Sequence, residues 1–229
     1  MKNFDSIAAE ALRYLGYKNQ KIEDELKYKI CELEEKVKKS CSPRTMSAFF
    51  TPEFLPDGVH LQNTKIILKG ENIKNHLDGA KKVAVLLCTL GSGFDLALMR
   101  NEQQSITDAT IFNALGSAYI EYIADSAQRD MAQKVYDEYR LYSNTRFSPG
   151  YGDLPIDASK MLIDACTAQK KIGLTITDDS ILIPRKSVTA LLGLFESEPP
   201  DAPAPCEICA YKNICSKRKE GNVCGKYKG

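Results

Sequence analysis

Hydrophobic positions recur at helical spacing through the N-terminal part of the chain. Residues 5–15 and 21–39 each place apolar side chains three and four positions apart, with charged side chains on the opposite face. Gly16 follows the first pattern and Pro43 follows the second, and both residue types end helices. The pattern therefore predicts two amphipathic helices within residues 1–42.

The rest of the chain mixes short strand-like runs with helical patterns. Its longest apolar run, Val83 to Leu90, fits a buried strand and is too short to span a bilayer. Further strands are expected at residues 45–50, 64–69, 174–176, 181–183 and 188–195, and further helices at 71–79, from 91–93 onward, at 107–141 and at 158–171. Since strands and helices follow no regular alternation, the pattern predicts an α+β fold, with helices packed around a largely antiparallel sheet.

Several side chains outside any motif carry expectations about burial. Inward-facing positions on the long helix are expected at Ile111, Leu115, Ala118 and Tyr122. Buried, small hydrophobic roles are expected for Cys31, Cys88 and Cys166. His76 is expected to be a partly exposed packing residue of the short helix at 71–79.

Residues 143–157 form a long loop between two helical patterns, and long loops are disproportionately functional. Pro149 fixes its φ angle and Gly150 allows close backbone approach, so this turn can aim backbone groups at a ligand. Arg146 offers a planar guanidinium that suits a carboxylate, and Tyr151 offers an aromatic face that can stack on a base or lie over a cation. S-Adenosylmethionine combines a carboxylate, an adenine ring and a sulfonium. The alternative is an ordinary turn with a surface arginine and a half-buried tyrosine.

A second glycine-rich turn, Gly91-Ser92-Gly93, lies between the apolar strand and a helix. Turns of this kind can bind phosphate at a helix N-terminus. This one lacks the spacing of either nucleotide-binding fingerprint and has no P-loop lysine, so an ordinary turn is the preferred interpretation.

Composition narrows the function classes. The chain has 229 residues, a formal net charge of +1 and 43% hydrophobic residues. The hydrophobic fraction is large enough to form a buried core. The small net charge does not indicate binding to nucleic acid or to an anionic membrane surface. The N-terminal residues include Asp5 and Glu10 and no long apolar stretch, so no secretory signal peptide is expected. We therefore expect a cytoplasmic protein without a nucleic acid or membrane partner.

The C-terminal part of the chain differs from the rest in composition. Residues 197–205 form a Pro-rich linker between a domain of residues 1–196 and a tail of residues 206–229. The tail has a C-x2-C-x5-C-x8-C pattern formed by Cys206, Cys209, Cys215 and Cys224. Four thiolates in a segment too small for its own core predict a metal site. A single C-x-x-C pair favours a [4Fe-4S] cluster, and structural zinc and free or disulfide-linked thiols remain the alternatives.

Several motifs in order resemble one known family. Residues 146–151 resemble the adenosylmethionine-binding motif of the activation domain of cobalamin-dependent methionine synthase, in which Arg, three residues and then Gly-Tyr occur. Residues 171–180 are similar to the Gly-x-x-Leu-Thr-Glu-Ser stretch of that family, and residues 184–188 to its Pro-x-x-Ser-Val turn. Residues 115–122 resemble the helix that precedes the loop. The resemblance covers roughly residues 80–195.

The resemblance implies reductive reactivation of a cobalamin-dependent methionine synthase or a related corrinoid methyltransferase. S-Adenosylmethionine would give its methyl group to Co(I) cobalamin on a partner protein, since this chain has no Asp-x-His-x-x-Gly motif. Arg146 would hold the methionyl carboxylate, the Pro149-Gly150 backbone would meet the adenine or the amine, and Tyr151 would pack beside the sulfonium or the nucleoside. Ser148 belongs to the same candidate ligand set, and any acidic role falls to Glu121. A cluster in the tail could relay the electron from a donor protein.

Two departures from the family keep other functions open. Ser117 stands where the family has a glutamate that faces the ligand, and no tyrosine pair follows Phe195. The chain could therefore be a non-catalytic adenosylmethionine- or corrinoid-binding module with a structural zinc or iron–sulfur tail. It could also be an interaction protein that has kept the fold and lost the ligand. Tight adenosylmethionine binding separates this last class from the others.

Overall fold

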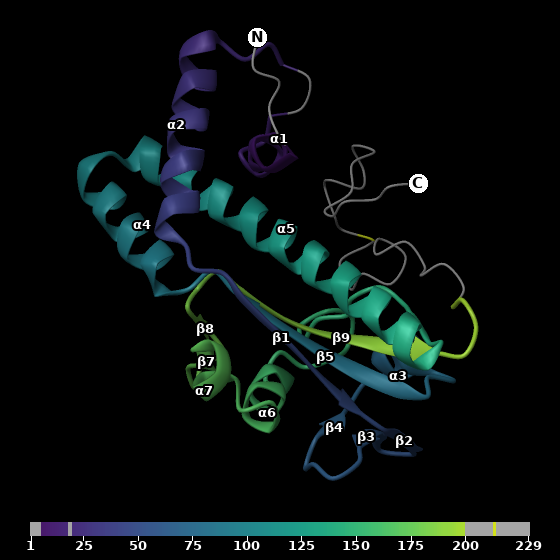
Figure 1. Ribbon diagram of the computed structural model, residues 1–229. Helices are drawn as coiled ribbons and strands as arrows, with labels where there is room; N and C mark the ends of the chain where they lie inside the picture. Colours follow the sequence, from purple (N-terminus) through teal and green to yellow (C-terminus); the bar gives the residue numbers. More distant parts are fainter. Residues whose placement is uncertain (1–5, 18–19, 200–212, 214–229) are drawn as a thin grey trace. The chain divides into compact units, whose positions relative to one another are not determined.

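The structure, a computed structural model, describes residues 6–17, 20–199 and 213. The helices are α1 (Ser6–Tyr14), α2 (Asp24–Ser40), α3 (Glu71–Leu77), α4 (Ser92–Gln104), α5 (Ile106–Tyr139), α6 (Ala158–Ala165) and α7 (Ala168–Ile172). The strands are β1 (Arg44–Phe50), β2 (Pro52–Leu55), β3 (Gly58–Leu61), β4 (Ile67–Leu68), β5 (Lys82–Thr89), β6 (Tyr142–Ser143), β7 (Thr175–Ile176), β8 (Leu182–Ile183) and β9 (Ser187–Phe195) (Figure 1).

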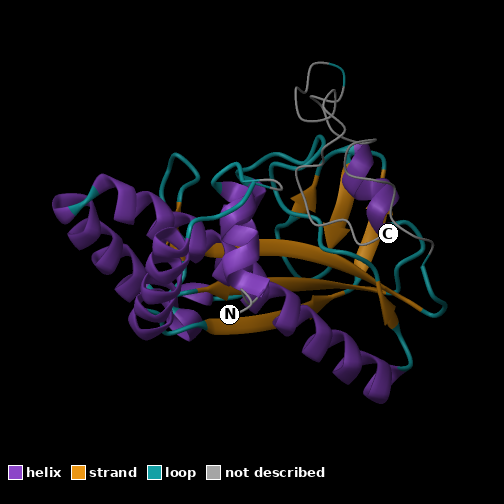
Figure 2. Cartoon of the chain, turned by 90° about the horizontal axis from the view of Figure 1, so that it is seen from above, coloured by secondary structure: helices purple, strands orange, loops and turns teal. Residues whose placement is uncertain are grey.

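The described strands form three sheets with antiparallel pairing. The largest sheet has the order β1-β5-β9-β6. Ser42, before β1, donates a backbone hydrogen bond to Leu90, after β5, and Leu90 donates one to Lys186, before β9, so neighbouring strands run in opposite directions. The smaller sheets are β2-β3-β4 and β7-β8, also antiparallel. The expected α+β class with a largely antiparallel sheet is confirmed (Figure 2).

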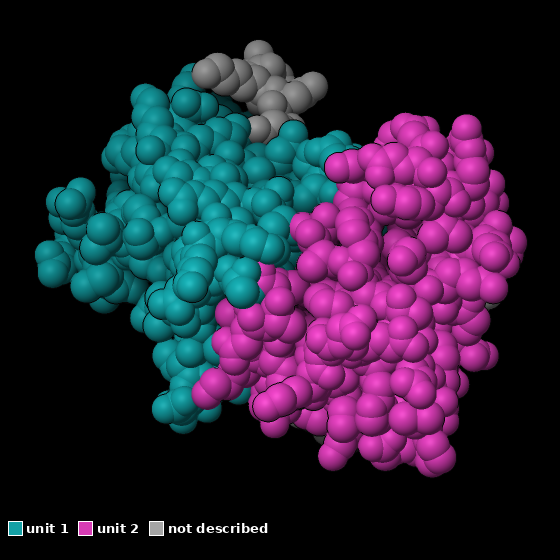
Figure 3. All heavy atoms as spheres, turned by 60° about the horizontal axis from the view of Figure 1, so that its bottom comes forward, with its two compact units in different colours: residues 1–46, 87–130, 167–188 teal, residues 47–86, 131–166, 189–229 magenta. Residues whose placement is uncertain are grey.

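The chain divides into two compact units, coloured separately in Figure 3. Unit 1 contains residues 1–46, 87–130 and 167–188, and unit 2 contains residues 47–86, 131–166 and 189–229. Four of the five boundaries fall within β1, β5, α5 and β9, so each of these elements contributes residues to both units, and the fifth lies between α6 and α7.

The core of unit 1 is built from the apolar faces of its helices. Phe94 of α4 and Phe112 of α5 are fully buried and stack with ring centroids 5.2 Å apart. Gly116 lies one turn after Phe112, and a methyl group there would overlap the Phe94 ring, so this position requires glycine. On α2, Ile30 and Leu33 are buried, as the helical stripe predicts.

The core of unit 2 draws on its short strands and on α3. Val59 and Leu68 of the β2-β3-β4 sheet have no exposed surface, and neither do Ile73 and Leu77 of α3. The hydroxyl groups of Ser159 in α6 and Thr189 in β9 lie 3.1 Å apart and are buried, so each satisfies the other.

Some of the expected elements are wrong in extent. The strands β2, β3 and β6 were not expected, because each is short and β2 begins with Pro52. The expected strand at residues 64–69 is reduced to Ile67–Leu68. The expected helix at 158–171 is two helices, since Thr167 takes the left-handed φ of 50° between them.

Burial departs from expectation at two of the named side chains. Tyr122 of α5 is 43% exposed instead of facing inward, and Cys31 of α2 is only half-buried. Cys88 and Cys166 are buried and His76 is a partly exposed residue of α3, as expected. In the described part of the chain, no helix has the length and apolar character that a membrane crossing requires.

Candidate functional site

The loop with the Arg-x-x-x-Gly-Tyr motif begins at the edge strand of the largest sheet, within unit 2. Tyr142 and Ser143 of β6 pair with Phe195 and Leu194 at the end of β9. Asn144 then exchanges hydrogen bonds with Gly193: its N–H donates to the Gly193 carbonyl at 3.1 Å, and its Oδ1 accepts from the Gly193 N–H at 2.7 Å. The entrance to the loop is therefore fixed on β9.

Phe147 anchors the middle of the loop. Its backbone forms an antiparallel bridge with Leu191 of β9, with N···O distances of 2.9 and 2.8 Å, and its side chain is 3% exposed. Arg146 immediately precedes this anchor and is partly exposed. A short, fixed segment of backbone therefore carries the guanidinium.

Backbone hydrogen bonds between its own residues hold the turn after Phe147. The Tyr151 N–H donates to the Ser148 carbonyl at 3.0 Å, and the Gly150 N–H donates to the Leu154 carbonyl at 2.9 Å. Gly150 has a φ of 89°, a conformation that favours glycine. Pro149 is buried, whereas Gly150 is exposed and its N–H is engaged, so the Gly150 carbonyl oxygen is the backbone group that the turn can offer a ligand.

A carbonyl oxygen accepts hydrogen bonds, and this sets the type of group that the turn can bind. An exocyclic amine of a purine or an ammonium group would donate to it. Tyr151, 58% exposed, adds an aromatic face beside it and meets the Phe147 ring edge-on with centroids 6.2 Å apart. The loop thus combines an acceptor, an aromatic face and the guanidinium of Arg146.

Asp153 ties the far side of the loop to α3. Its Oδ2 accepts a hydrogen bond from the Glu71 N–H at 2.7 Å, and its Oδ1 accepts one from the Asn72 N–H at 3.0 Å. Gly70, with a φ of 129°, lets this carboxylate approach, because a Cβ there would collide with it. A residue distant in sequence thus caps the N-terminus of α3.

His76, near the C-terminal end of α3, also contacts the loop. Its Nε2 lies 3.0 Å from the Thr145 carbonyl oxygen, and its ring centroid lies 5.0 Å from that of Phe147. Its backbone carbonyl accepts a hydrogen bond from Asn144 Nδ2 at 2.7 Å. Burial lowers the pKa of His76 below its ordinary value, so the neutral ring is the form that this environment favours.

The predicted ligand residues do not all lie in one unit. Arg146, Ser148, Gly150 and Tyr151 belong to unit 2, whereas Glu121 lies on α5 in unit 1. There its charge acts on Tyr14 of α1: burial raises the pKa of Tyr14, and Glu10 and Glu121 raise it further. The structure therefore brings four of the five predicted residues together in one loop.

Ser117 has a partner of its own in unit 1. Lys186 Nζ donates to Ser117 Oγ at 2.7 Å and lies 5.8 Å from the centroid of the Phe94 ring. Burial lowers the pKa of Lys186. Ser117 therefore contacts an ammonium group.

The glycines of the second turn have a structural cause. A Cβ at Gly93 would collide with the Ser40 carbonyl oxygen, and one at Gly91 would lie 3.2 Å from that of Ser42. Asp95 also places a negative charge in the first turn of α4, where a phosphate would have to bind. Close packing explains Gly91 and Gly93 without a ligand.

The predicted metal ligands Cys206, Cys209, Cys215 and Cys224 lie outside the described residues. Within residues 6–17, 20–199 and 213, no group of three or more His, Cys, Asp or Glu side chains could hold a metal ion. The described cysteines, Cys31, Cys41, Cys88 and Cys166, form no disulfide bond with one another.

Sequence reasoning missed the residues that support the loop. Asn144 and Asp153 flank the Arg-x-x-x-Gly-Tyr motif and His76 lies far from it, and their partners are distant in sequence, up to 82 positions away for Asp153. No local signal in the Gly-Tyr-Gly-Asp segment assigns Asp153 to the N-terminus of α3, because the helix that it caps lies far upstream in the sequence.

Comparisons with known proteins find the fold without assigning a family. No family model matches the chain, and no curated protein matches it. Among solved structures it is similar to the "Crystal Structure of the MetH Reactivation Domain bound to AdoHcy", with 14% sequence identity and a TM-score of 0.50. The likeness covers 92% of this chain and 76% of that chain. The chain therefore shares the α+β fold of the MetH reactivation domain.

Proposed function

We propose that this chain binds S-adenosylmethionine through residues 146–151 and reactivates a cobalamin-dependent methionine synthase or a related corrinoid methyltransferase. The observation that carries the proposal is a rigidly held loop with an exposed Gly150-Tyr151 turn beside Arg146. The likeness in fold to a reactivation domain solved with AdoHcy supports it.

Each group of the loop has a role that its chemistry suits. Arg146 binds the methionyl carboxylate through its planar fork. The carbonyl oxygen of the exposed Gly150 accepts a hydrogen bond from the adenine amine or from the ammonium group. Tyr151 packs against the nucleoside or the sulfonium, and Ser148 borders the same surface.

The chain's own contribution to the reaction is to hold and orient the methyl donor. When bound, S-adenosylmethionine supplies the methyl group to a reduced corrinoid carried by a partner protein, leaving S-adenosylhomocysteine. The loop fixes the direction in which the sulfonium methyl points, because both of its sides are held, by β9 and by α3. Orientation of this kind converts binding energy into rate.

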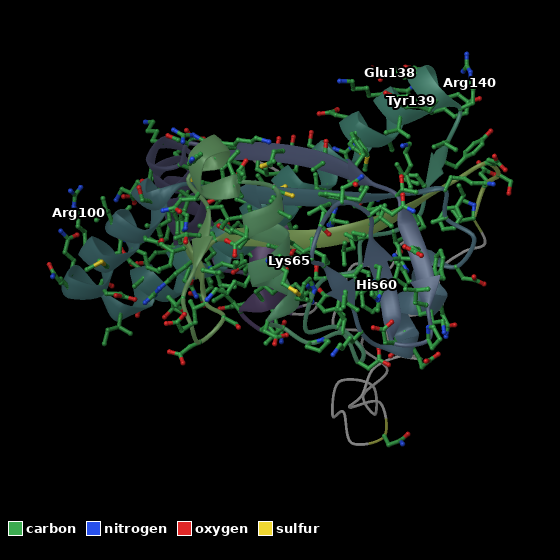
Figure 4. The ribbon with its side chains drawn as sticks, turned by 90° about the horizontal axis from the view of Figure 1, so that it is seen from below. His60, Lys65, Arg100, Glu138, Tyr139 and Arg140 are labelled. Carbon is green, nitrogen blue, oxygen red and sulfur yellow. The ribbon has the colours of Figure 1, made fainter. Side chains whose placement is uncertain are left out.

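Calorimetry with S-adenosylmethionine tests the binding step. Arg146→Ala should cost about 2–4 kcal/mol of binding free energy, the scale for removing one partner of a desolvated charge pair. Arg100→Ala is the matched control, since Arg100 is an exposed residue of α4 that forms no ion pair with the described residues (Figure 4). Equal binding by Arg146→Ala and wild type would refute the assignment of the loop.

A methyl-transfer assay tests the reaction itself. An inactive Co(II) corrinoid protein, a low-potential reductant and methyl-labelled S-adenosylmethionine are mixed with and without the chain. The label should reach cobalt faster with the wild-type chain, and Arg146→Ala should lose this effect. Equal rates with and without the chain, for several corrinoid partners, would refute reactivation.

A metal site in residues 206–229 completes the proposal. We infer that Cys206, Cys209, Cys215 and Cys224 bind a [4Fe-4S] cluster that passes an electron from a donor protein, with zinc as the alternative. Anaerobic purification with metal analysis and an absorption spectrum separates the two, because an iron–sulfur cluster is coloured and zinc is not. Replacing any one of the four by Ser should release the metal, whereas Cys31→Ser should not. Four free thiols without metal would refute this part.

A non-catalytic binding module is the second candidate function. The contact between Lys186 and Ser117 supports it, because Ser117, where the resemblance expects an acidic side chain that faces the ligand, accepts a hydrogen bond from an ammonium group instead. Binding of S-adenosylmethionine without any acceleration of methyl transfer would favour this module over the reactivation component.

A further inference from the structure

His76 meets the candidate ligand loop through both its backbone and its side chain. The residues that it contacts, Asn144, Thr145 and Phe147, lie on both sides of Arg146. Phe147 is also the residue bridged to β9. The position of His76 therefore sets the backbone from which the Arg146 guanidinium projects, although His76 is not part of the binding motif.

The contact with Thr145 defines the protonation state of the ring. A carbonyl oxygen can only accept a hydrogen bond, so Nε2 carries the proton and Nδ1 of the neutral ring does not. No described residue bonds to Nδ1. Burial lowers the pKa of His76 below its ordinary 6.5, and the Thr145 carbonyl opposes this shift only in part. A second proton would therefore place a charged N–H where the described residues provide no acceptor.

Charged neighbours do not offset the free-energy cost of protonating His76. Glu71 and Lys74 lie on α3, Asp78 follows it, and Arg146 lies on the loop. None of them contributes to the pKa shift of His76, whose causes are burial and one backbone carbonyl. The protonated ring is therefore better solvated in water than in its place beside the loop.

We propose that His76 is the positioning residue of the adenosylmethionine loop and that it holds the loop in its binding form only as a neutral imidazole. The inference rests on the proposed function and adds a proton-linked control of the same site. A protonated His76 leaves its place at Thr145 and Phe147, so fewer molecules have a loop that can bind. The apparent affinity falls with that fraction, by up to about tenfold per pH unit below the pKa of His76.

Calorimetric titration with S-adenosylmethionine between about pH 7.5 and 5.5 tests the proposal. The chain has 2 histidines, so one substitution serves as a matched control for the other. His60 lies on β3 and its Nε2 is 2.9 Å from Asp57 Oδ1 (Figure 4). His60→Gln should therefore keep the wild-type pH profile.

Two variants of His76 separate positioning from mere packing. His76→Gln has a side-chain N–H that can reach the Thr145 carbonyl and that does not titrate, so it should bind with a flat pH profile. His76→Ala lacks this hydrogen bond and should bind about fivefold more weakly at pH 7.5, the size expected for one hydrogen bond.

Hydrogen exchange of the amides of residues 144–151 adds a readout that needs no ligand. Corrected for intrinsic rates, wild-type amides should lose protection as the pH falls through the lowered pKa of His76, and those of His76→Gln should not. If wild type binds and His76→Gln retains the wild-type pH profile, the positioning role is overturned and the proposed function stands. If wild type does not bind S-adenosylmethionine at any pH, the proposed function fails. The role of His76 is then decided by hydrogen exchange alone, and it is overturned if the protection of the wild-type amides of residues 144–151 does not depend on pH.

Discussion

Asp153 caps α3 from the far side of the ligand loop, and removing its carboxylate should destabilise unit 2. The two carboxylate oxygens accept hydrogen bonds from consecutive N–H groups, at 2.7 Å from Glu71 and 3.0 Å from Asn72. These N–H groups have no intrahelical acceptor, because they belong to the first turn of the helix. Asp153→Ala leaves both of them to water and removes a negative charge from the positive end of the helix dipole.

The expected size follows from the chemistry of the cap. Loss of an N-cap side chain costs about 0.5–2 kcal/mol, and two bonds to a carboxylate place Asp153 in the upper half of this range, at roughly 1–2 kcal/mol. Exposure of the cap keeps it from rising further, because water can reach the N–H groups. Asp153→Asn retains an oxygen that can accept one bond, so about half of the loss should return.

Urea denaturation measures the free energy of unfolding, and thermal melting should show a decrease of about 2–4 °C per kcal/mol for a chain of this size. Asp157→Ala is the matched control. Asp157 occupies the N-cap position of α6 and makes no side-chain cap hydrogen bond, so its loss should change stability by less than about 0.5 kcal/mol. If Asp153→Ala is no more harmful than Asp157→Ala, the reasoning from the cap is refuted.

Three further predictions concern unit 1. Lys186→Met should leave stability unchanged or raise it by up to about 1 kcal/mol in urea denaturation, because a half-buried ammonium with the Ser117 hydroxyl and the Phe94 ring as its partners is replaced by an apolar side chain of similar length. Burial lowers the pKa of Lys186, so the destabilisation of the wild type by this buried charge should lessen as the pH rises toward the ordinary lysine pKa of 10.5. A loss of stability above 1 kcal/mol in the variant would contradict this account. Gly116→Ala should cost about 1–3 kcal/mol through overlap with the Phe94 ring, and an unchanged melting temperature would argue against that overlap. Burial raises the pKa of Cys41 to about 12, so iodoacetamide at pH 8 should modify Cys41 in the denatured chain and spare it in the folded one, as peptide mass spectrometry can check.

The sequence predicts best where one local signal decides the outcome. The apolar run Val83–Leu90 contains most of a buried strand, observed as β5 at Lys82–Thr89. A run of this kind is stable only where its apolar side chains are removed from water in a core. The loop with Arg146 and Tyr151 is indicated by its Pro-Gly turn and by its place between two helical patterns. The roles of these residues as ligands stay predictions.

The supports of the loop could not be read from the sequence, because their partners are set by the tertiary fold. Nothing in the sequence around Asp153 indicates that it caps α3, and nothing in the sequence around His76 indicates that it forms a hydrogen bond with the Thr145 carbonyl. The left-handed Thr167 is another example, since its neighbours continue a helical pattern that the backbone interrupts. Tyr122 was misplaced because a long helix can carry apolar residues on a face that is not covered.

The course of the chain through its two units has a consequence for dissection by genetics or by protease. The backbone passes from one unit to the other after Met46, Leu86, Asp130, Cys166 and Val188. Neither unit is a continuous stretch of sequence, so no single cut or truncation can release either of them whole. A fragment ending at Met46, Leu86, Asp130 or Val188 would also divide a strand or helix. Gene fusion or recombination can therefore transfer this fold only as one block, and fragments made to study the ligand loop should keep the chain from α1 to β9 intact.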